Sequence, residues 1–289
     1  MLLIYSNLCL IFIKKYRSYS ANITKGFFAM NISFINDEYS NNLNDALAFA
    51  RKHQLKYIEL RNINGKNITD LTSDEALEYS AQIAQSGILV SAINTPFLNW
   101  QYGEHNFNIS GQHIDSEEEY FIKLMDIADI FGAQYISIYS YFNNNMDIDA
   151  LGKQLDIYSQ KALERGIVLL LNIDKNCNIS NINKIHQLFE NYNFSNIYPL
   201  INTGKIIAEN DNYNPQELQD IINTCNYFYL SDYDNELKRY VVLGEGHLDL
   251  DMILHDKKAD NSIFVSLYPA TGHPEDLTMS LNQLQTWED

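Results

Sequence analysis

The sequence is poor in cysteine and in basic residues. Its three cysteines, Cys9, Cys177 and Cys225, lie far apart, with no CxxC pair and no histidine at zinc-finger spacing. They predict reduced thiols and exclude both a disulfide framework and a zinc site. Lysine and arginine number 20 against 37 acidic residues, and the formal net charge is -17. Such a chain, with no local basic stripe, would repel a phosphate backbone, so nucleic acid is excluded as a partner.

The sequence also lacks an apolar run long enough to cross a membrane. A largely apolar run of 13 residues ends at Ile13, and Lys14, Lys15 and Arg17 follow it. It is too short for a bilayer, and its charges follow the run, whereas a secretory signal has them in front. We therefore expect no stable membrane insertion and a cytoplasmic protein. Residues 1–29 are interpreted as an N-terminal extension, which either packs against nothing, with Met30 as the true start, or is a weak targeting segment.

What the sequence does contain is a regular alternation of strand-like and helix-like segments. Short connections between eight such pairs favour a closed barrel over an open sheet, and 289 residues suit one barrel better than two domains. We predict an α/β protein, a single-domain (β/α)8 TIM barrel over residues 30–289. The expected strands are residues 31–36, 55–61, 88–94, 134–140, 167–174, 196–204, 226–232 and 262–268.

The fifth predicted strand indicates where a functional site would lie. The segment from Ile167 opens with five apolar residues, which is typical of a parallel strand buried on both faces, and it ends in polar Asn172 and Asp174. In barrels of this kind, polar residues at the carboxyl ends of the strands face the active site. The loop at residues 95–115 is the one predicted loop long enough to act as a lid.

Eight blocks of the sequence stand in a specific order and spacing. They are YIELRNINGKNITDLTSDE, LVSAINTPF, FGAQYISIYSYF, ERGIVLLLNID, INTGK, YLSD, LGEGHLDLDMIL and FVSLY. Together they resemble the sugar phosphate isomerase/epimerase group, the xylose-isomerase-like barrels, from about Asn31 to the C-terminus. The resemblance implies a carbohydrate or sugar phosphate as ligand, and a divalent metal held by Glu, Asp, His and Glu at the ends of strands five to eight.

When the four ligands are carried over one at a time, each falls on a neutral residue. These residues are Asn172, Asn202, Tyr229 and Tyr268. A hard divalent cation needs carboxylate and imidazole donors, whereas an amide oxygen is a weak ligand and a phenol a poor one. A shift of two residues recovers one ligand only, Asp174. We therefore predict no metal and no other cofactor, and we interpret the four residues as substrate-binding.

Other residues of the same mouth are candidates for binding or chemistry. Asp232 and Glu245 are interpreted as substrate-binding, with a structural hydrogen bond and a tight turn as the respective alternatives. Glu59, at the end of strand two, is predicted as a catalytic base or an acceptor for substrate hydroxyls. Its alternative is an ion pair with Arg61 or Lys66.

Lys205 lies three residues beyond Asn202. Its flexible stem could place an ammonium near the position of the lost metal, where it would neutralise a substrate phosphate or carboxylate. A Schiff-base lysine and a solvated loop lysine are the other two interpretations.

The sequence leaves two functions open. The first is a divergent sugar isomerase, epimerase or related lyase that does not depend on a metal. The second is a catalytically inactive barrel that binds a carbohydrate or a protein partner, because a fold of this kind hosts many functions. Whether the protein is an enzyme therefore stays open here. Related barrels often form dimers, so a homodimer is a further expectation.

Overall fold

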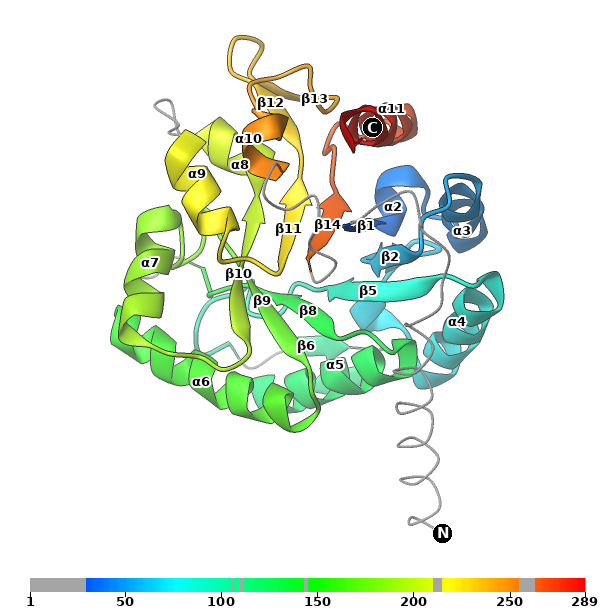
Figure 1. Cartoon of the computed structure of the whole chain (residues 1–289). Coiled ribbons are helices and arrows are strands. Elements are labelled where there is room, and N and C mark those ends of the chain that lie inside the picture. Colours follow the sequence, from blue (N-terminus) through cyan, green and yellow to red (C-terminus); the bar gives the residue numbers. More distant parts are fainter. Residues whose placement is uncertain are drawn as a thin grey trace.

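The computed structural model describes residues 30–104, 107–109, 112–142, 145–209, 215–254 and 263–288. Eight parallel strands form one sheet in the order β1-β14-β11-β10-β9-β8-β5-β2, and helices surround it (Figure 1). The end strands, β1 (Asn31–Phe34) and β2 (Tyr57–Leu60), are joined by an isolated bridge between Ile35 and Glu59. The ring is therefore nearly closed, and the predicted TIM barrel is confirmed.

The other barrel strands lie within the predicted ranges. They are β5 (Leu89–Asn94), β8 (Tyr135–Ile138), β9 (Val168–Asn172), β10 (Ile197–Asn202), β11 (Tyr227–Leu230) and β14 (Phe264–Leu267). The parallel register sets Asn172 opposite Leu200 and Asn202 opposite Tyr229. Because parallel strands end at the same edge of a sheet, this register brings the polar strand ends together at one mouth of the barrel.

The helices begin and end at residues that cap them well. Helix α4 (Ser73–Ser86) starts with a capping box between Thr72 and Glu75 and ends at Gly87 with a left-handed backbone. The other helices are α2 (Asn36–Tyr39), α3 (Leu43–Lys52), α5 (Glu117–Phe131), α6 (Ile148–Glu164), α7 (Ile182–Asn191), α8 (Thr203–Glu209), α9 (Pro215–Ile222), α10 (Leu250–Leu254) and α11 (Pro274–Glu288).

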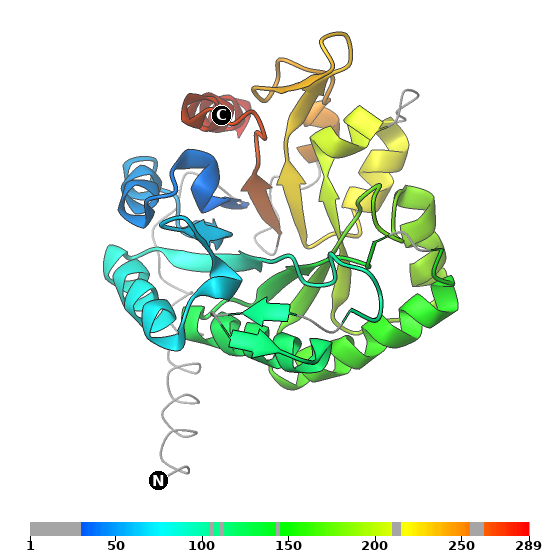
Figure 2. The same cartoon turned by 180° about the vertical axis from the view of Figure 1, so that it is seen from behind.

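In the described residues, three short antiparallel hairpins interrupt the loops, and the sequence did not predict them. They are β3 (Asn62–Ile63) with β4 (Lys66–Asn67), β6 (Phe107–Ile109) with β7 (Gln112–Ile114), and β12 (Asp232–Asp234) with β13 (Arg239–Val241). Strands of two or three residues are too short to give an alternation of apolar and polar residues. The second hairpin packs against α5 and occupies part of the loop that was expected to be a lid (Figure 2).

The predicted N-terminal extension, residues 1–29, lies outside the described residues. Within the described part of the chain, no helix combines the length and the apolar character needed to span a membrane.

Candidate functional site

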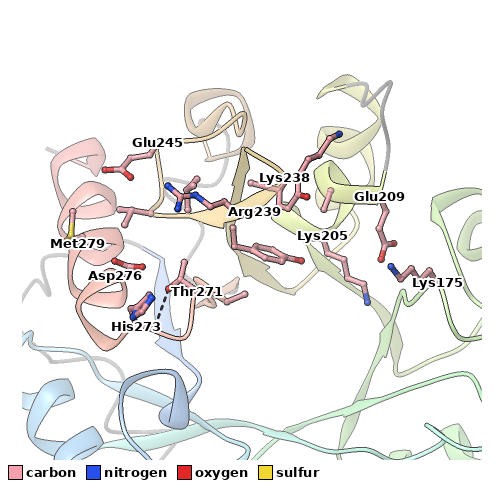
Figure 3. Close-up of a pocket in the computed structure, with 16 residues that line it drawn as sticks. Lys175, Lys205, Glu209, Lys238, Arg239, Glu245, Thr271, His273, Asp276 and Met279 are labelled. Carbon is pink, nitrogen blue, oxygen red and sulfur yellow. Dashed lines mark hydrogen bonds between the residues drawn. The ribbon is translucent and has the colours of Figure 1, made fainter. Parts of the chain in front are cut away.

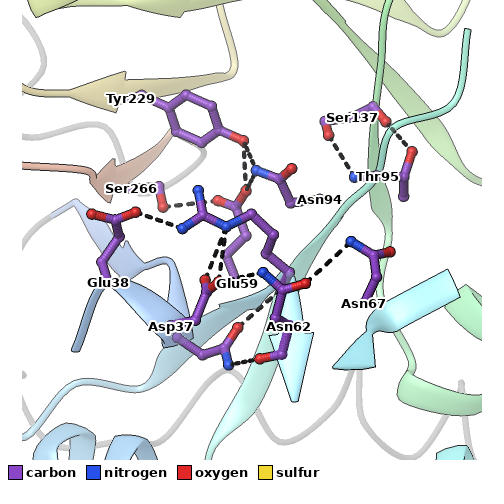
Figure 4. Close-up of polar contacts among 12 residues, drawn as sticks. Asp37, Glu38, Glu59, Asn62, Asn67, Asn94, Thr95, Ser137, Tyr229 and Ser266 are labelled. Carbon is purple, nitrogen blue, oxygen red and sulfur yellow. Dashed lines mark hydrogen bonds and ion pairs between the residues drawn. The ribbon is translucent and has the colours of Figure 1, made fainter. Parts of the chain in front are cut away.

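A buried carboxylate lies inside the barrel on β2. Glu59 is fully buried, and its two oxygens accept four hydrogen bonds. Figure 4 shows those from Tyr229, Asn94 and Ser266. Its Oε1 accepts from the Tyr229 hydroxyl at 2.6 Å and from the Asn94 amide at 3.0 Å. Its Oε2 accepts from the Tyr227 hydroxyl at 2.6 Å and from the Ser266 hydroxyl at 2.8 Å. All four donors are neutral, and they come from three other barrel strands.

These four neutral donors satisfy the carboxylate of Glu59, as a cation would otherwise do. Burial, and then the charge of Glu59, raise the pKa of Tyr227 and Tyr229 well above the usual range, so both hydroxyls stay protonated and donate at neutral pH. A buried carboxylate is costly unless hydrogen bonds satisfy it, and here its lone pairs are all used. A ligand could reach Glu59 only if one of the present donors left.

Arg61 belongs to a different cluster at the end of β2. Its Nε lies 3.0 Å from Oδ1 of Asp37, and its Nη2 lies 2.6 Å from Oε1 of Glu38. Burial raises the pKa of Glu38, although Arg61 opposes this shift. Lys66 pairs with Glu75 instead. The alternative interpretation of Glu59, an ion pair with Arg61 or Lys66, is therefore wrong, because both cations have other partners.

Asparagines end strands β9 and β10. Asn172 donates its Nδ2 hydrogen to the carbonyl of Ile138 at 3.0 Å. Asn202 accepts at Oδ1 from the backbone N–H of Lys205 at 2.9 Å and from the Ser231 hydroxyl at 2.6 Å. The hydrogen bonds of the Asn202 side chain start helix α8 directly after the strand. Strand β10 therefore ends two residues earlier than predicted.

The ammonium of Lys205 lies at the same mouth and already has a counter-ion. Its Nζ is 2.6 Å from Oδ2 of Asp174, the residue that follows strand β9 by two positions. Burial alone would raise the pKa of Asp174, but the hydrogen bonds from Lys205 and Asn176 outweigh it and lower that pKa below the usual value. The predicted substitute cation is therefore neutralised within the protein.

A cavity of about 790 Å³ opens beside these strand ends (Figure 3). It lies between α8, the hairpin β12–β13, the segment after β14 and the start of α11. Of the predicted site residues, Lys205 and Glu245 line it. Tyr240 also lines it, and burial raises the pKa of this phenol to about 12, so it is a hydrogen-bond donor at neutral pH.

Asp232 is fully buried and binds the backbone of the loop after the hairpin. One oxygen accepts the N–H groups of Gly244 and Gly246, each at 2.9 Å, and the other accepts those of Tyr233 and Leu248. A Cβ at Gly246 would lie 2.7 Å from the backbone oxygen of Tyr233. These bonds account for Asp232 as a structural residue, while its neighbour Glu245 faces the cavity.

Several of the predicted residues contact one another at the mouth of the barrel. Tyr229 contacts Glu59, and its ring meets the ring of Tyr268 edge to face at 5.6 Å between centroids. Asn94, which the sequence analysis did not single out, also touches Glu59. The signal that finds it is the same one that found Asn172, namely a polar residue at the end of an apolar strand.

The family of the chain follows from a sequence comparison. Residues 47–277 match the family described as the xylose isomerase-like TIM barrel. The chain belongs to this family. A search of curated proteins gives no significant match.

This xylose isomerase-like barrel also resembles solved structures at low sequence identity, which supports the fold alone. A zinc-bound IOLI protein is 18% identical, with a TM-score of 0.65 over 89% of this chain and 96% of that one. The 3-keto-D-glucoside 4-epimerase YcjR from E. coli is 14% identical, with a TM-score of 0.64 over 88% and 99%. A D-tagatose 3-epimerase-like protein is 11% identical, with a TM-score of 0.67 over 89% and 97%.

The strand ends of this xylose isomerase-like barrel do not fit a divalent metal. Among the described residues, no group of three or more His, Cys, Asp and Glu side chains is placed to hold one. The Asn202 oxygen already accepts two hydrogen bonds, and the Tyr229 hydroxyl donates to Glu59. What remains is a set of amide and phenol groups, which bind such cations weakly.

Proposed function

We propose that this barrel binds a small carbohydrate at its mouth without a divalent metal. Asn172, Asn202, Tyr229 and Tyr268 then stand where the metal ligands of the family stand and contact the sugar or its surroundings. One observation carries this proposal: the neutral strand-end residues Asn202 and Tyr229 are hydrogen-bonded to Ser231 and Glu59, while a cavity of about 790 Å³ beside them stays open. A cavity of this size at the carboxyl ends of barrel strands suits a small molecule.

Lys205 is the predicted catalytic residue that borders this cavity. In an active isomerase, epimerase or lyase, a base must take a proton from the sugar and an acid must return one. Lys205 and Asp174 form an ion pair that supplies one hydrogen-bond donor group and one acceptor group beside the cavity. Glu59 enters the reaction only after Tyr229 or Asn94 releases it, since its oxygens are otherwise occupied.

A catalytically inactive binding protein is the second candidate. The saturated hydrogen bonding of Glu59 favours it, because this carboxylate has no free lone pair for a substrate hydroxyl. Proton exchange between bound sugar and deuterated water, followed by NMR, separates the two candidates. Conversion of the sugar, or deuterium in one of its carbon positions, identifies an enzyme, and binding with neither identifies a binder.

The proposal is tested by metal content and by ligand binding together. After loading with manganese, cobalt or zinc and dialysis, elemental analysis should find no stoichiometric metal; one tightly bound equivalent would overturn the proposal. A thermal-shift screen of sugars and sugar phosphates should give at least one stabilising ligand. Lys205→Ala should reduce the shift, and Lys153→Ala, which breaks a similar pair with Asp149 on helix α6, should not.

A further inference from the structure

Three asparagines stand at the ends of barrel strands, and each has one side of its amide fixed by the protein. They are Asn94 on β5, Asn172 on β9 and Asn202 on β10. All three are partly exposed. Strands β5, β8, β9 and β10 are consecutive neighbours in the sheet, so the three amides lie along one part of the mouth.

Asn94 is held by Glu59 and Tyr229. Its Nδ2 donates to Oε1 of Glu59 at 3.0 Å and to the Tyr229 oxygen at 2.8 Å. In Figure 4 the amide nitrogen points toward these two residues and the oxygen points away from them. A carboxylate can only accept, and the Tyr229 hydroxyl has given its hydrogen to Glu59, so the amide cannot turn over. Its Oδ1 is therefore left as an acceptor.

The other two amides are fixed by backbone groups. The Nδ2 of Asn172 faces the carbonyl of Ile138, which can only accept, so the Oδ1 of Asn172 is left as an acceptor. The Oδ1 of Asn202 faces the N–H of Lys205, which can only donate, so the Nδ2 of Asn202 is left as a donor. Among the described residues, the buried side-chain polar atoms without a partner lie elsewhere, on His53 and Gln219. The three remaining amide atoms are therefore not fully buried.

We propose that Asn94, Asn172 and Asn202, the amide triad, bind an uncharged polyhydroxy ligand. Asn94 and Asn172 accept hydrogen bonds from two ligand hydroxyls, and Asn202 donates to a third oxygen. This inference rests on the proposed carbohydrate function and narrows the ligand to a neutral sugar. Glu59 is a positioning residue in this arrangement, because it acts on the ligand through Asn94.

The pairing of the two cations at the strand ends supports a neutral ligand. Lys205 is paired with Asp174, and Arg61 is shared between Asp37 and Glu38. An anionic group at the strand ends would therefore meet no unpaired ammonium or guanidinium from these two residues. A hydroxyl can donate to one amide and accept from another, so a sugar matches two acceptors and one donor without any charge.

Calorimetric titration with D-xylose and D-fructose, and with D-fructose 6-phosphate and D-glucuronate as charged counterparts, tests the triad. Asn94→Ala and Asn172→Ala should each weaken neutral-sugar binding about tenfold, as the loss of one hydrogen bond does. Asn202→Asp keeps an oxygen for the bonds that start α8 and replaces the amide donor with a charged acceptor, so it should weaken binding at least as much. The exposed Asn191→Ala on helix α7 is the matched control and should bind like wild type.

A double-variant comparison of sugar binding tests whether Glu59 positions Asn94. Glu59→Gln should weaken binding about as much as Asn94→Ala, and the double variant should be no weaker than either single one, because both changes remove the same contact. Losses that simply add would show that Glu59 does not act through Asn94. Circular dichroism of each variant at the titration temperature establishes that it is folded.

The outcomes separate this inference from the proposed function. Neutral sugars that bind wild type and Asn191→Ala, and bind the triad variants about tenfold more weakly, support both. Neutral sugars that bind all variants equally overturn the triad and leave the carbohydrate function standing. Binding of the phosphate or the uronate alone overturns the neutral ligand but not the function. No saturable binding of any of the four sugars overturns both.

Discussion

The two sides of the barrel mouth handle polar groups in opposite ways. On the side of β2, β11 and β14, the oxygens of Glu59 are fully occupied by neutral neighbours within the barrel. On the side of α8 and the hairpin β12–β13, charged side chains such as Arg239 and Glu209 line an open cavity. A polar group that is satisfied inside the protein stabilises the fold, and one that is left open to solvent is available to a ligand. The first side therefore stabilises the fold, and the second is accessible to a ligand.

The largest effect should come from breaking the satisfied side. Glu59→Ala leaves the buried hydroxyls of Tyr227 and Tyr229 without their acceptor, so we expect a loss of about 3–5 kcal/mol in the free energy of unfolding, measured in urea. Glu209→Ala on the cavity side should cost less than about 0.5 kcal/mol. Equal losses at the two positions would contradict the division.

A backbone position next to the cavity gives the second test. Gly246→Ala would press a Cβ against the Asp232 carboxylate and the Tyr233 carbonyl. Overpacking of this kind costs about 1–3 kcal/mol. Urea unfolding measures this loss in the free energy of unfolding. Glu245→Ala is the control, because the Glu245 side chain faces the cavity. If the two variants were equally stable, the loop would be free to move away from Asp232.

The same substitution on each side gives a smaller and better matched effect. Tyr227→Phe removes a hydroxyl that donates to Glu59 and also contacts Ser91, so it should cost about 1–2 kcal/mol. Tyr240→Phe removes a hydroxyl at the cavity and should cost less than about 0.5 kcal/mol. The difference between the two midpoints in urea is the quantity to compare, and a larger loss at Tyr240 would reverse the assignment.

The smallest effect concerns the Asp174–Lys205 pair. Because the pKa of Asp174 is lowered in the folded protein, the pair stabilises the fold above the usual aspartate pKa, and this contribution disappears as the pH falls below about 4. Lys205→Met should raise the pKa of Asp174, as measured by NMR, and cost about 1 kcal/mol or less at pH 7. An unchanged pKa would mean that the pair does not persist in solution.

The sequence predicted the fold well because buried parallel strands leave local patterns. The apolar run that ends at Asn172 is β9. The partners of Glu59 left no such pattern. Tyr227 and Ser266 lie 168 and 207 residues away from it along the chain, and only closure of the barrel brings them together. The nearest charges, Arg61 and Lys66, were for that reason the wrong partners to choose.

The isolated bridge between β1 and β2 has a consequence for how the chain folds. Glu59 is synthesised early, on the second barrel strand. One of the hydrogen bonds to its carboxylate comes from Ser266 on the last barrel strand. Until that strand docks, the carboxylate keeps its water, and removing this water without a replacement is costly. Closure of the ring should therefore be a late, long-range step, and a nascent chain that lacks β14 should expose Glu59 to solvent.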